Sequence, residues 1–382
     1  TCSHPDAPST FEVSAGRDKR GNSFSAMTGM NLFFLFPQGR RVLCFFISPG
    51  LYFAGRFTFN ICKSMYDVVA LGELLIDFTP CGINDRELPV YQANPGGAPC
   101  NVLSMLSRLG RKTSFIGKVG HDMFGKMLRR TLQEEGIGDS GLVSSREVNT
   151  TLAFVQIDEH GDREFSFYRN PGADMKLTAG EVALELVEHA RVFHFGTISM
   201  THDDVRRATR HAVSQARKKG ALISFDPNLR PALWENDEMM RKVLNDLANY
   251  ADVVLPGIGE CEILAGTTDK EKAADFYHQK GAALVVIKDG KNGAYVSEKK
   301  ENGEVVRDMI PGYPVKKVVD TVGAGDGFAV GVLSGLLKGL PVTECAKRGN
   351  AIGSIQVQHR GDNEGLPTEE ILQSYMAGNI QK

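Results

Sequence analysis

The seven residues Asp320-Thr-Val-Gly-Ala-Gly-Asp326 carry the most specific chemical pattern in the chain. We expect a strand to end near Val319 and a helix to begin near Asp326. The turn between them consists of Gly323, Ala324 and Gly325. Small residues there let backbone N–H groups at a helix start point into open space, where they favour an anion. Asp326 fits a helix cap, and it also fits a general base that takes a proton from a hydroxyl attacking a phosphoryl group.

A second glycine-rich segment is Asn94-Pro-Gly-Gly-Ala-Pro-Cys-Asn101, which precedes a helical pattern. The adjacent Gly96 and Gly97 allow a ligand to approach the backbone closely. Asn101 offers both a donor and an acceptor to hydroxyl groups. Taken alone, the segment is equally a turn followed by a helix N-cap.

Polar residues also follow a buried strand in Ser224-Phe-Asp-Pro-Asn-Leu-Arg230. Asp226, Asn228 and Arg230 would lie at the carboxyl end of that strand, where open α/β sheets bind ligands. Arginine suits bidentate contact with phosphate or carboxylate. A turn between prolines explains the prolines but not the polar cluster. Arg169, further up the chain, either reaches into the same cleft or faces solvent.

Motifs that the chain lacks exclude several classes of enzyme. It has no GxxxxGK[ST] segment, which excludes Walker-type ATPases, and no GxGxxG fingerprint after a first strand, which argues against a Rossmann dehydrogenase. Neither a GxSxG elbow nor an HExxH metal motif is present. The glycine-rich turns therefore do not belong to any of these enzyme classes.

The elements that must position these residues alternate along the chain. Short apolar runs typical of buried parallel strands occur within 65–78 and at 113–119, 192–195, 221–225, 253–255 and 284–287. Helical patterns lie between them at 101–109, 124–135, 203–219 and 238–250. This alternation predicts a doubly wound α/β domain with a mostly parallel sheet.

One part of the chain breaks that alternation. Residues 150–168 form two alternating segments around a Gly-containing turn, which predicts a β-hairpin. Residues 80–93 are polar and extended. Two such excursions, at about 78–95 and 150–172, predict a small β-sheet that covers a cleft as a lid; surface hairpins without such a role are the alternative.

Residues 1–64 differ in composition from the remainder. They are poor in acidic residues and rich in phenylalanine. A targeting segment, a membrane anchor and translated upstream sequence outside any folded domain are the three interpretations. We favour the third, because the first strand of a domain begins directly after Met65; arginines interrupt every apolar run before a spanning length of ~18 residues is reached.

The 382 residues have a formal net charge of −2 and a hydrophobic content of 42%, which is typical of a globular protein. Nothing in this balance favours nucleic acid or a membrane as a partner. The seven cysteines show no CxxC spacing, so reduced thiols of a cytoplasmic protein are expected.

Taken in order, the motifs at Gly96-Gly97 and 320–326 resemble those of the ribokinase-like (PfkB) carbohydrate kinases, over about 65–366. The resemblance implies a three-layer sandwich with a β-sheet lid. It implies that Asp326 is the catalytic base and that Gly323, Ala324 and Gly325 form an anion hole. The resemblance implies that Asp77, Gly97 and Asn101 bind sugar hydroxyls and that Asn228 lies near the phosphates and Mg²⁺. Substrate-binding candidates further include Gly96, Asn228, Arg169 and Arg230.

The resemblance also implies ATP and Mg²⁺ as cofactors. Gly290 and Asn350 would flank the nucleotide, and Glu260 would lie near Mg²⁺, through water. The loops of Asp320, Val322 and Gly361 would hold a monovalent cation such as K⁺. One departure is that Gly257 stands where many members have the Asn of an Asn-x-x-Glu motif, so Lys288 is expected to supply a charge there.

Within the family, the segments 73–77, 94–99, 167–174 and 226–234 are similar to those of fructokinases. We therefore expect phosphorylation of fructose to fructose 6-phosphate. The alternative is 2-keto-3-deoxygluconate kinase, whose substrate carboxylate Arg169 or Arg230 could bind. A nucleoside kinase and a non-catalytic sugar-binding regulator are the remaining alternatives. A homodimer is an expectation from the resemblance.

Overall fold

The computed structural model describes residues 12–17, 23–27, 31–35, 41–45, 64–157, 163–359, 361 and 366–378. The chain divides into two units, Thr1–Phe53 and Ala54–Lys382. In the first, strands β1 (Glu12–Arg17), β2 (Ser23–Met27), β3 (Asn31–Leu35) and β4 (Arg41–Phe45) form an antiparallel sheet in chain order. The expectation that residues 1–64 belong to no folded domain stays a prediction.

The second unit is built on a nine-stranded sheet of order β17-β16-β15-β14-β13-β12-β5-β8-β9. Neighbours from β15 to β9 pair in parallel, and β16 and β17 are antiparallel at one edge. The strands are β5 (Tyr66–Leu71), β8 (Thr113–Gly120), β9 (Gly138–Ser145), β12 (Ala190–Phe195), β13 (Leu222–Phe225), β14 (Val253–Val254), β15 (Leu284–Lys288), β16 (Ala294–Lys299) and β17 (Val305–Ile310). The predicted α/β fold with a mostly parallel sheet is confirmed.

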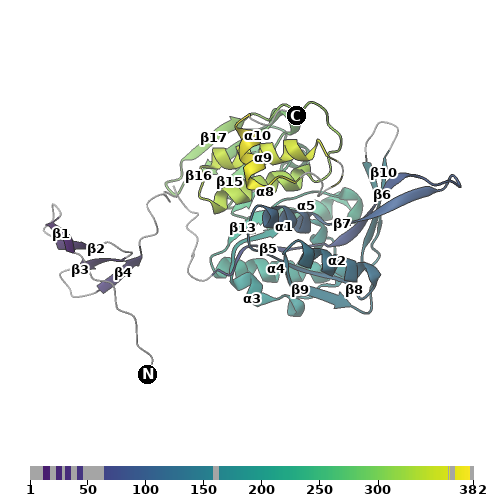
Figure 1. Cartoon of the computed structure of the whole chain (residues 1–382), viewed down its shortest axis with the longest axis horizontal. Helices are drawn as coiled ribbons and strands as arrows, with labels where there is room; N and C mark the ends of the chain where they lie inside the picture. Colours follow the sequence, from purple (N-terminus) through teal and green to yellow (C-terminus); the bar gives the residue numbers. More distant parts are fainter. Residues whose placement is uncertain are drawn as a thin grey trace, which may run out of the picture. The chain divides into compact units, whose positions relative to one another are not determined.

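Helices follow the strands as predicted, in two layers (Figure 1). They are α1 (Ala98–Arg108), α2 (Met123–Glu134), α3 (Leu184–Glu188), α4 (Asp203–Lys218), α5 (Asp237–Leu247), α6 (Ile258–Ala265), α7 (Lys270–Gln279), α8 (Ala324–Leu337), α9 (Val342–Gln356) and α10 (Glu369–Met376). Helices α3 to α7 share one hydrophobic core with the sheet. Helix α8 packs against both α1 and α9, and α1 also packs on β5 and β8.

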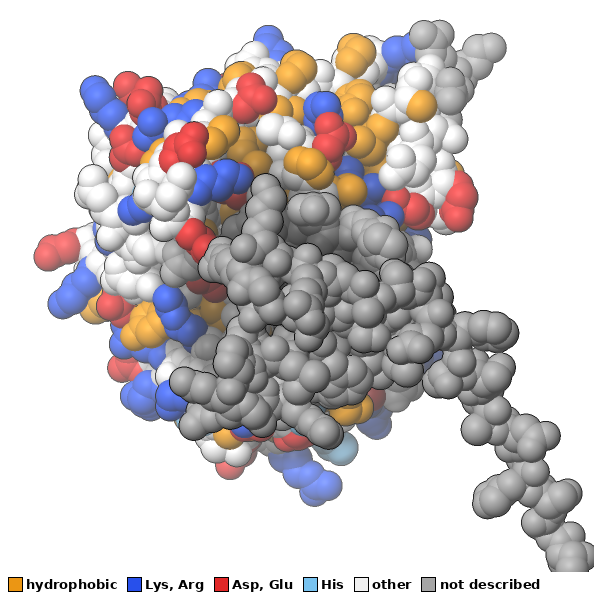
Figure 2. All heavy atoms as spheres, turned by 90° about the vertical axis from the view of Figure 1, so that its left-hand side faces the viewer, with side chains coloured by type: hydrophobic (Ala, Val, Ile, Leu, Met, Phe, Trp, Pro, Cys, Tyr) orange, Lys and Arg blue, Asp and Glu red, His pale blue; other side chains and the backbone are white. Residues whose placement is uncertain are grey.

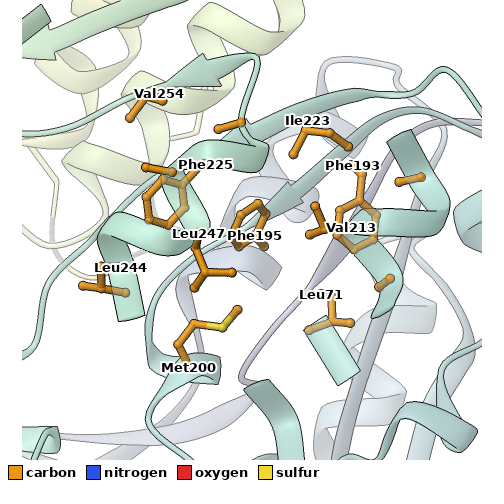
Figure 3. Close-up of a cluster of buried hydrophobic side chains, with 14 of the residues drawn as sticks. Leu71, Phe193, Phe195, Met200, Val213, Ile223, Phe225, Leu244, Leu247 and Val254 are labelled. Carbon is orange, nitrogen blue, oxygen red and sulfur yellow. The ribbon is translucent and has the colours of Figure 1, made fainter. Parts of the chain in front are cut away.

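The core shows why short apolar runs become central strands. Alternate residues of each strand point to one face, so Phe193 and Phe195 of β12 lie beside Ile223 and Phe225 of β13 (Figure 3). The rings of Phe195 and Phe225 stack with centroids 5.0 Å apart. Because both faces of these strands are covered by helices, the runs are mostly apolar. The polar residues within them, His194 of β12 and Ser224 of β13, are also buried and hydrogen-bond to each other at 3.0 Å.

The two excursions from the α/β pattern pair with each other in a small four-stranded sheet of order β11-β10-β6-β7. Its strands are β6 (Leu75–Ile83), β7 (Pro89–Gly96), β10 (Leu152–Ile157) and β11 (Arg163–Tyr168). In Figure 1, β6 and β10 run side by side away from the helices, and their rings Phe78 and Phe154 stack at 4.7 Å. The predicted separate small sheet is confirmed.

One local prediction is wrong. The described residues 311–323 form no strand, and the backbone N–H groups of Val319 and Asp320 donate instead to the carbonyl of Val357, after α9. Helix α8 begins at Ala324, two residues before Asp326. The segment is therefore a loop held by a neighbouring helix end, since Val319 is exposed rather than buried in the sheet.

Charged side chains of both signs are interspersed over the described part of the face shown in Figure 2. This distribution agrees with the net charge of −2. Among the described residues, no helix is long and apolar enough to cross a membrane.

Candidate functional site

A cavity of about 470 Å³ lies where the small sheet meets the starts of α1 and α8. The small sheet contributes Asp77 and Thr79 from β6, Val155 from β10, and Phe165 and Phe167 from β11. The other walls include Gly97, Ala98, Asn101, Asn228, Arg230, Thr321, Val322, Gly323, Gly325, Asp326 and Gly361. Both glycine-rich turns and the polar loop after β13 thus meet at one cavity.

Asp326 is the third residue of α8 and is 9% exposed. The side-chain amide of Asn101 donates a hydrogen bond to its Oδ2 at 3.0 Å. Asp326 is not the helix cap, because the N-cap position is Gly323, with φ of 73°, and no side chain caps α8. The N–H of Ala324 donates to the carbonyl of Thr321 at 3.3 Å and that of Gly327 to the carbonyl of Gly323 at 2.8 Å. The N–H groups of Gly323 and Gly325 are left to meet an anion at this helix start.

Gly96 and Gly97, at the junction of β7 and α1, have no room for a side chain because other atoms lie too close to them. A Cβ on Gly96 would lie 2.0 Å from Oδ2 of Asp77. Gly97 has φ of 116°, and a Cβ there would lie 2.4 Å from the carbonyl oxygen of Glu73. The pair thus lets β7 pass directly into α1 beside Asp77. Asp77, Gly97 and Asn101 line one cavity, and their role in sugar binding stays a prediction.

Lys288 and Asp226 form a buried ion pair next to the start of α8. The ammonium group of Lys288 lies 2.7 Å and 2.9 Å from the two carboxylate oxygens of Asp226. It would also lie 3.7 Å from a Cβ on Gly325. Burial by itself would lower the pKa of Lys288, but Asp226 and Glu260 outweigh it, so the pKa is raised. Lys288 is therefore a permanent cation beside the anion-binding turn.

Glu260 lies on α6 and is bound on both carboxylate oxygens. Oε1 accepts from the N–H of Leu229 at 2.7 Å, and Oε2 accepts from the N–H of Gly257 at 2.6 Å. Burial raises the pKa of Glu260. The residue ties the loop after β13 to the start of α6.

A magnesium site would need few protein ligands here. Among the described residues, no group of three or more His, Cys, Asp or Glu side chains is arranged to hold a metal ion. Mg²⁺ commonly binds one or two carboxylates and completes its shell with water and substrate phosphates. Both oxygens of Asp226 are bound by Lys288, and both oxygens of Glu260 accept backbone N–H groups. Glu260 would therefore reach Mg²⁺ through water rather than as a direct ligand.

Arg169 lies outside the cavity wall. Its guanidinium group forms an ion pair with Asp174 at 2.6 Å, and it donates to Thr201 and to the carbonyl of Ile198. The side chains of the pair are 3% and 1% exposed. Thr151, at the start of the β10–β11 hairpin, also donates to Asp174. Arg169 neither reaches the cleft nor faces solvent; it anchors both ends of the hairpin to the body.

Arg230 is instead the arginine of the cavity wall. It donates to Oδ1 of Asn228 at 2.7 Å and to the carbonyl of Leu229 at 2.9 Å. Its guanidinium carbon lies 5.7 Å from the ring centre of Phe165, within range of a cation–π contact. Asn228 adopts φ of 39°, which turns the chain sharply after β13.

The remaining predicted residues occupy loops around α8 and α9. Asp320 accepts from the N–H of Val322 at 3.0 Å and from the N–H of Gly361 at 2.9 Å, so these two loops are tied together. Asn350 donates to the carbonyls of Ile310 and Pro311. Gly290, in the turn after β15, has open space around it. Gly290 and Asn350 do not line the cavity of about 470 Å³.

Several residues of the cavity wall were not predicted as site residues from the sequence, among them Glu73, Phe165 and Phe167. The alternation in β11 places both phenylalanines on one face of the small sheet, a signal that was present in the sequence. Glu73 gave no such signal, because an acid next to a glycine after a strand ordinarily belongs to an exposed turn.

Comparison with known proteins agrees with this geometry. Residues 65–369 match the sequence profile of the family described as pfkB family carbohydrate kinase. A 2-dehydro-3-deoxygluconokinase of Bacillus subtilis is 39% identical over 314 residues, covering 81% of this chain and 95% of the relative. Fructokinase-1 of Zea mays is 39% identical over 317 residues, covering 80% and 96%.

A solved structure shows the same fold. It is a double-mutant fructokinase of Vibrio cholerae, bound to fructose, ADP and a potassium ion, with a TM-score of 0.72 and 28% identity. The alignment covers 82% of this chain and 99% of that chain.

Proposed function

Because the chain belongs to the pfkB family of ATP-dependent carbohydrate kinases, we propose that it phosphorylates fructose at the primary hydroxyl, giving fructose 6-phosphate. The observation that carries the proposal is the meeting of Asp326 with Asn101 beside the open first turn of α8. A general base and an anion-binding helix start in one cavity suit phosphoryl transfer to a hydroxyl.

In this mechanism, Asp326 accepts the proton of the sugar hydroxyl as it attacks the γ-phosphorus of ATP. Asn101 holds the carboxylate through its 3.0 Å hydrogen bond. The N–H groups of Gly323 and Gly325 would stabilise the charge on the transferring phosphoryl group, and Lys288 adds a positive charge next to them. The N–H of Ala324, implied in the anion hole by the family resemblance, donates instead to the carbonyl of Thr321. The phosphorus–oxygen bond to ADP breaks as the new one forms.

The small sheet supplies the sugar side of the site. Asp77, Gly97 and Asn101 would bind the sugar hydroxyls, and Phe165 and Phe167 present apolar surface to the same cavity. We propose that this sheet is a lid that excludes water during transfer, because competing hydrolysis of ATP requires water at the phosphate.

The nucleotide and ion assignments remain part of the proposal. Gly290 and Asn350 would flank the nucleotide, and Mg²⁺, when bound near Glu260, would neutralise phosphate charge. The loops joined by Asp320 would hold a monovalent cation; the related fructokinase of Vibrio cholerae contains a potassium ion.

A second substrate, 2-keto-3-deoxygluconate, is favoured by one observation. Arg230 lines the cavity and can offer its remaining guanidinium N–H groups to a carboxylate. Arg169, the other arginine considered from the sequence, is held by Asp174. Of the two arginines, Arg230 is therefore the one that could bind the carboxylate of such a substrate.

A coupled assay of ADP release over a sugar panel tests the proposal. The panel contains fructose, 2-keto-3-deoxygluconate, ribose and adenosine. We expect fructose to give the highest kcat/KM. Turnover of 2-keto-3-deoxygluconate without turnover of fructose would replace the substrate, and absence of phosphotransfer to all four would contradict a catalytic role.

A further inference from the structure

Glu73 is a buried carboxyl group in the cavity wall that has no part in the mechanism above. It lies in the bend between β5 and β6, the residue is 1% exposed, and it lines the cavity beside Gly97 and Ala98. Glutamate is rarely buried this completely unless it is bound to something, because removal of a carboxylate from water is costly. The contacts of the Glu73 side chain therefore indicate what role it has in the site.

The first contact is with the start of α1. Oε1 of Glu73 accepts a hydrogen bond from the N–H of Ala98 at 3.1 Å. The N-cap position of α1 is Gly97, which has no side chain to cap the helix. The carbonyl oxygen of Glu73 is also the atom that a Cβ on Gly97 would strike. Glu73 thus caps α1 from a different segment of the chain.

Helix α1 carries this contact to the catalytic base. The N–H of Asn101 donates to the carbonyl of Gly97 at 2.9 Å, which closes the first turn of the helix. The side chain of Asn101 then donates to Asp326 at 3.0 Å. A shift in the Gly97–Ala98 turn must therefore move the amide that holds the base.

The second carboxyl oxygen of Glu73 is different. Oε2 is buried and has no hydrogen-bond partner among the described residues. The charged groups that act on Glu73 are Asp174 and Arg169, the ion pair that anchors the small sheet. Burial, the largest effect, raises the pKa of Glu73 to about 7. A buried carboxyl group with one oxygen that accepts no hydrogen bond lowers the stability of the folded protein.

We propose that Glu73 is a positioning residue of the sugar site, which fixes the Gly97–Ala98 turn and thereby holds Asn101 against Asp326. The inference rests on the proposed function, because it assigns the effect of Glu73 to the sugar and to phosphoryl transfer. Among the described residues, no hydrogen bond joins Gly290 or Asn350, the proposed nucleotide-binding residues, to the Gly97–Ala98 turn.

Three substitutions of Glu73 test this role. Glu73→Ala removes the acceptor for Ala98, and we expect the KM for sugar to rise about 10- to 100-fold with a fall in kcat, as loss of a charged hydrogen bond implies. The KM for ATP should stay within about twofold of wild type, which is below ~0.5 kcal/mol. Glu73→Gln keeps an oxygen at the same reach and should restore most activity. Glu73→Asp keeps the carboxylate, but the shorter side chain moves it away from the N–H of Ala98, so this variant should resemble Glu73→Ala.

A matched control exists at the other end of the same helix. Glu135 binds Ser104 and Arg108 of α1, so Glu135→Gln loosens the helix without touching the Gly97–Ala98 turn. We expect that variant to keep the wild-type KM for sugar. If Glu73→Ala fails to fold by circular dichroism, the comparison of Glu73→Asp with Glu73→Gln decides the question.

Calorimetric titration of sugar into the same proteins separates the two proposals. Wild type that neither binds nor phosphorylates any sugar of the panel contradicts the proposed function. A wild-type enzyme that works, together with unchanged sugar affinity and kcat in Glu73→Ala, overturns the role of Glu73. An equal rise of the KM for ATP and for sugar, or a Glu73→Gln variant as impaired as Glu73→Ala, also overturns it.

Discussion

The amide nitrogen of Asn101 lies 3.0 Å from Oδ2 of Asp326, although the two residues are 225 positions apart in the chain. Each belongs to the first turns of a helix that follows a glycine-rich segment, α1 and α8 respectively. The contact brings the two motifs of the sequence into one cavity, and in the proposed function it connects the residues that bind sugar with those that meet the phosphate.

Removal of the base should abolish turnover without loss of nucleotide binding. For Asp326→Ala we expect kcat to fall about 10²- to 10⁴-fold, because a general base contributes on that order. ATP affinity, measured by calorimetry, should be nearly unchanged. Asp203→Ala is the matched control, since Asp203 is also an acid in a first helical turn but has an exposed side chain. Near-normal kcat in Asp326→Ala would reject the assignment.

The hydrogen bond to the base should matter almost as much. Asn101→Ala removes a donor to a carboxylate, a bond of about 1.5–3 kcal/mol, so kcat/KM for sugar should fall about 10- to 100-fold. Steady-state kinetics at fixed, saturating ATP provide the measurement. An unaltered kcat/KM would show that Asp326 holds its position without Asn101.

The Lys288–Asp226 pair should be essential for folding stability as well as for ATP use. Its side chains are 18% and 7% exposed, so Lys288→Met leaves a buried, unpaired carboxylate and should cost about 3–5 kcal/mol of unfolding free energy. Adding Asp226→Asn should recover much of that loss, while the KM for ATP stays high. Urea unfolding measures the first effect. The exposed pair Arg130–Glu134 is the control, with an expected change below about 1 kcal/mol.

Arg169 should act on stability rather than on substrate choice. Arg169→Gln breaks an ion pair with side chains 3% and 1% exposed, and we expect a loss of about 3–5 kcal/mol. Relative kcat/KM values across the sugar panel should keep their order. A selective loss of the keto-acid substrate would instead place Arg169 at the substrate, whereas we expect that selective loss from Arg230→Gln.

Acid should destabilise the protein partly through His194. Burial, with a smaller effect of Lys288, lowers the pKa of His194 to about 3 from an ordinary value near 6.5. Between these values the unfolded chain binds a proton that the folded protein does not, so stability is full above pH ~6.5 and is lost as the pH falls towards 3.

His194→Asn should reduce this dependence, with a slope of unfolding free energy against pH that is smaller by up to ~1.4 kcal/mol per pH unit. Urea unfolding at several pH values between 4 and 7 measures the slope. His121→Asn is the control, because His121 is exposed. An unchanged slope in His194→Asn would show that His194 is protonated in the folded protein.

The sequence by itself determined the fold class and the members of the main turns. Apolar runs that alternate with helical patterns specify a covered parallel sheet, because strands buried on both faces are predominantly apolar. Gly96, Gly97 and Gly323 were recognisable because each occupies a backbone position that a side chain would strain or obstruct. Local constraints of this kind can be recognised from the residue type alone.

Only the tertiary structure decided which charged residues serve the cavity. Arg169 and Arg230 have similar surroundings in sequence, yet Arg169 is held by Asp174 while Arg230 lines the cavity. The burial of Glu73 depends on β7 and α1 packing over it. An ion pair or a buried carboxyl oxygen depends on segments that are far apart in the chain. The hydrophobic pattern of the sequence does not specify which charged residues will come into contact, so their partners are decided by tertiary packing.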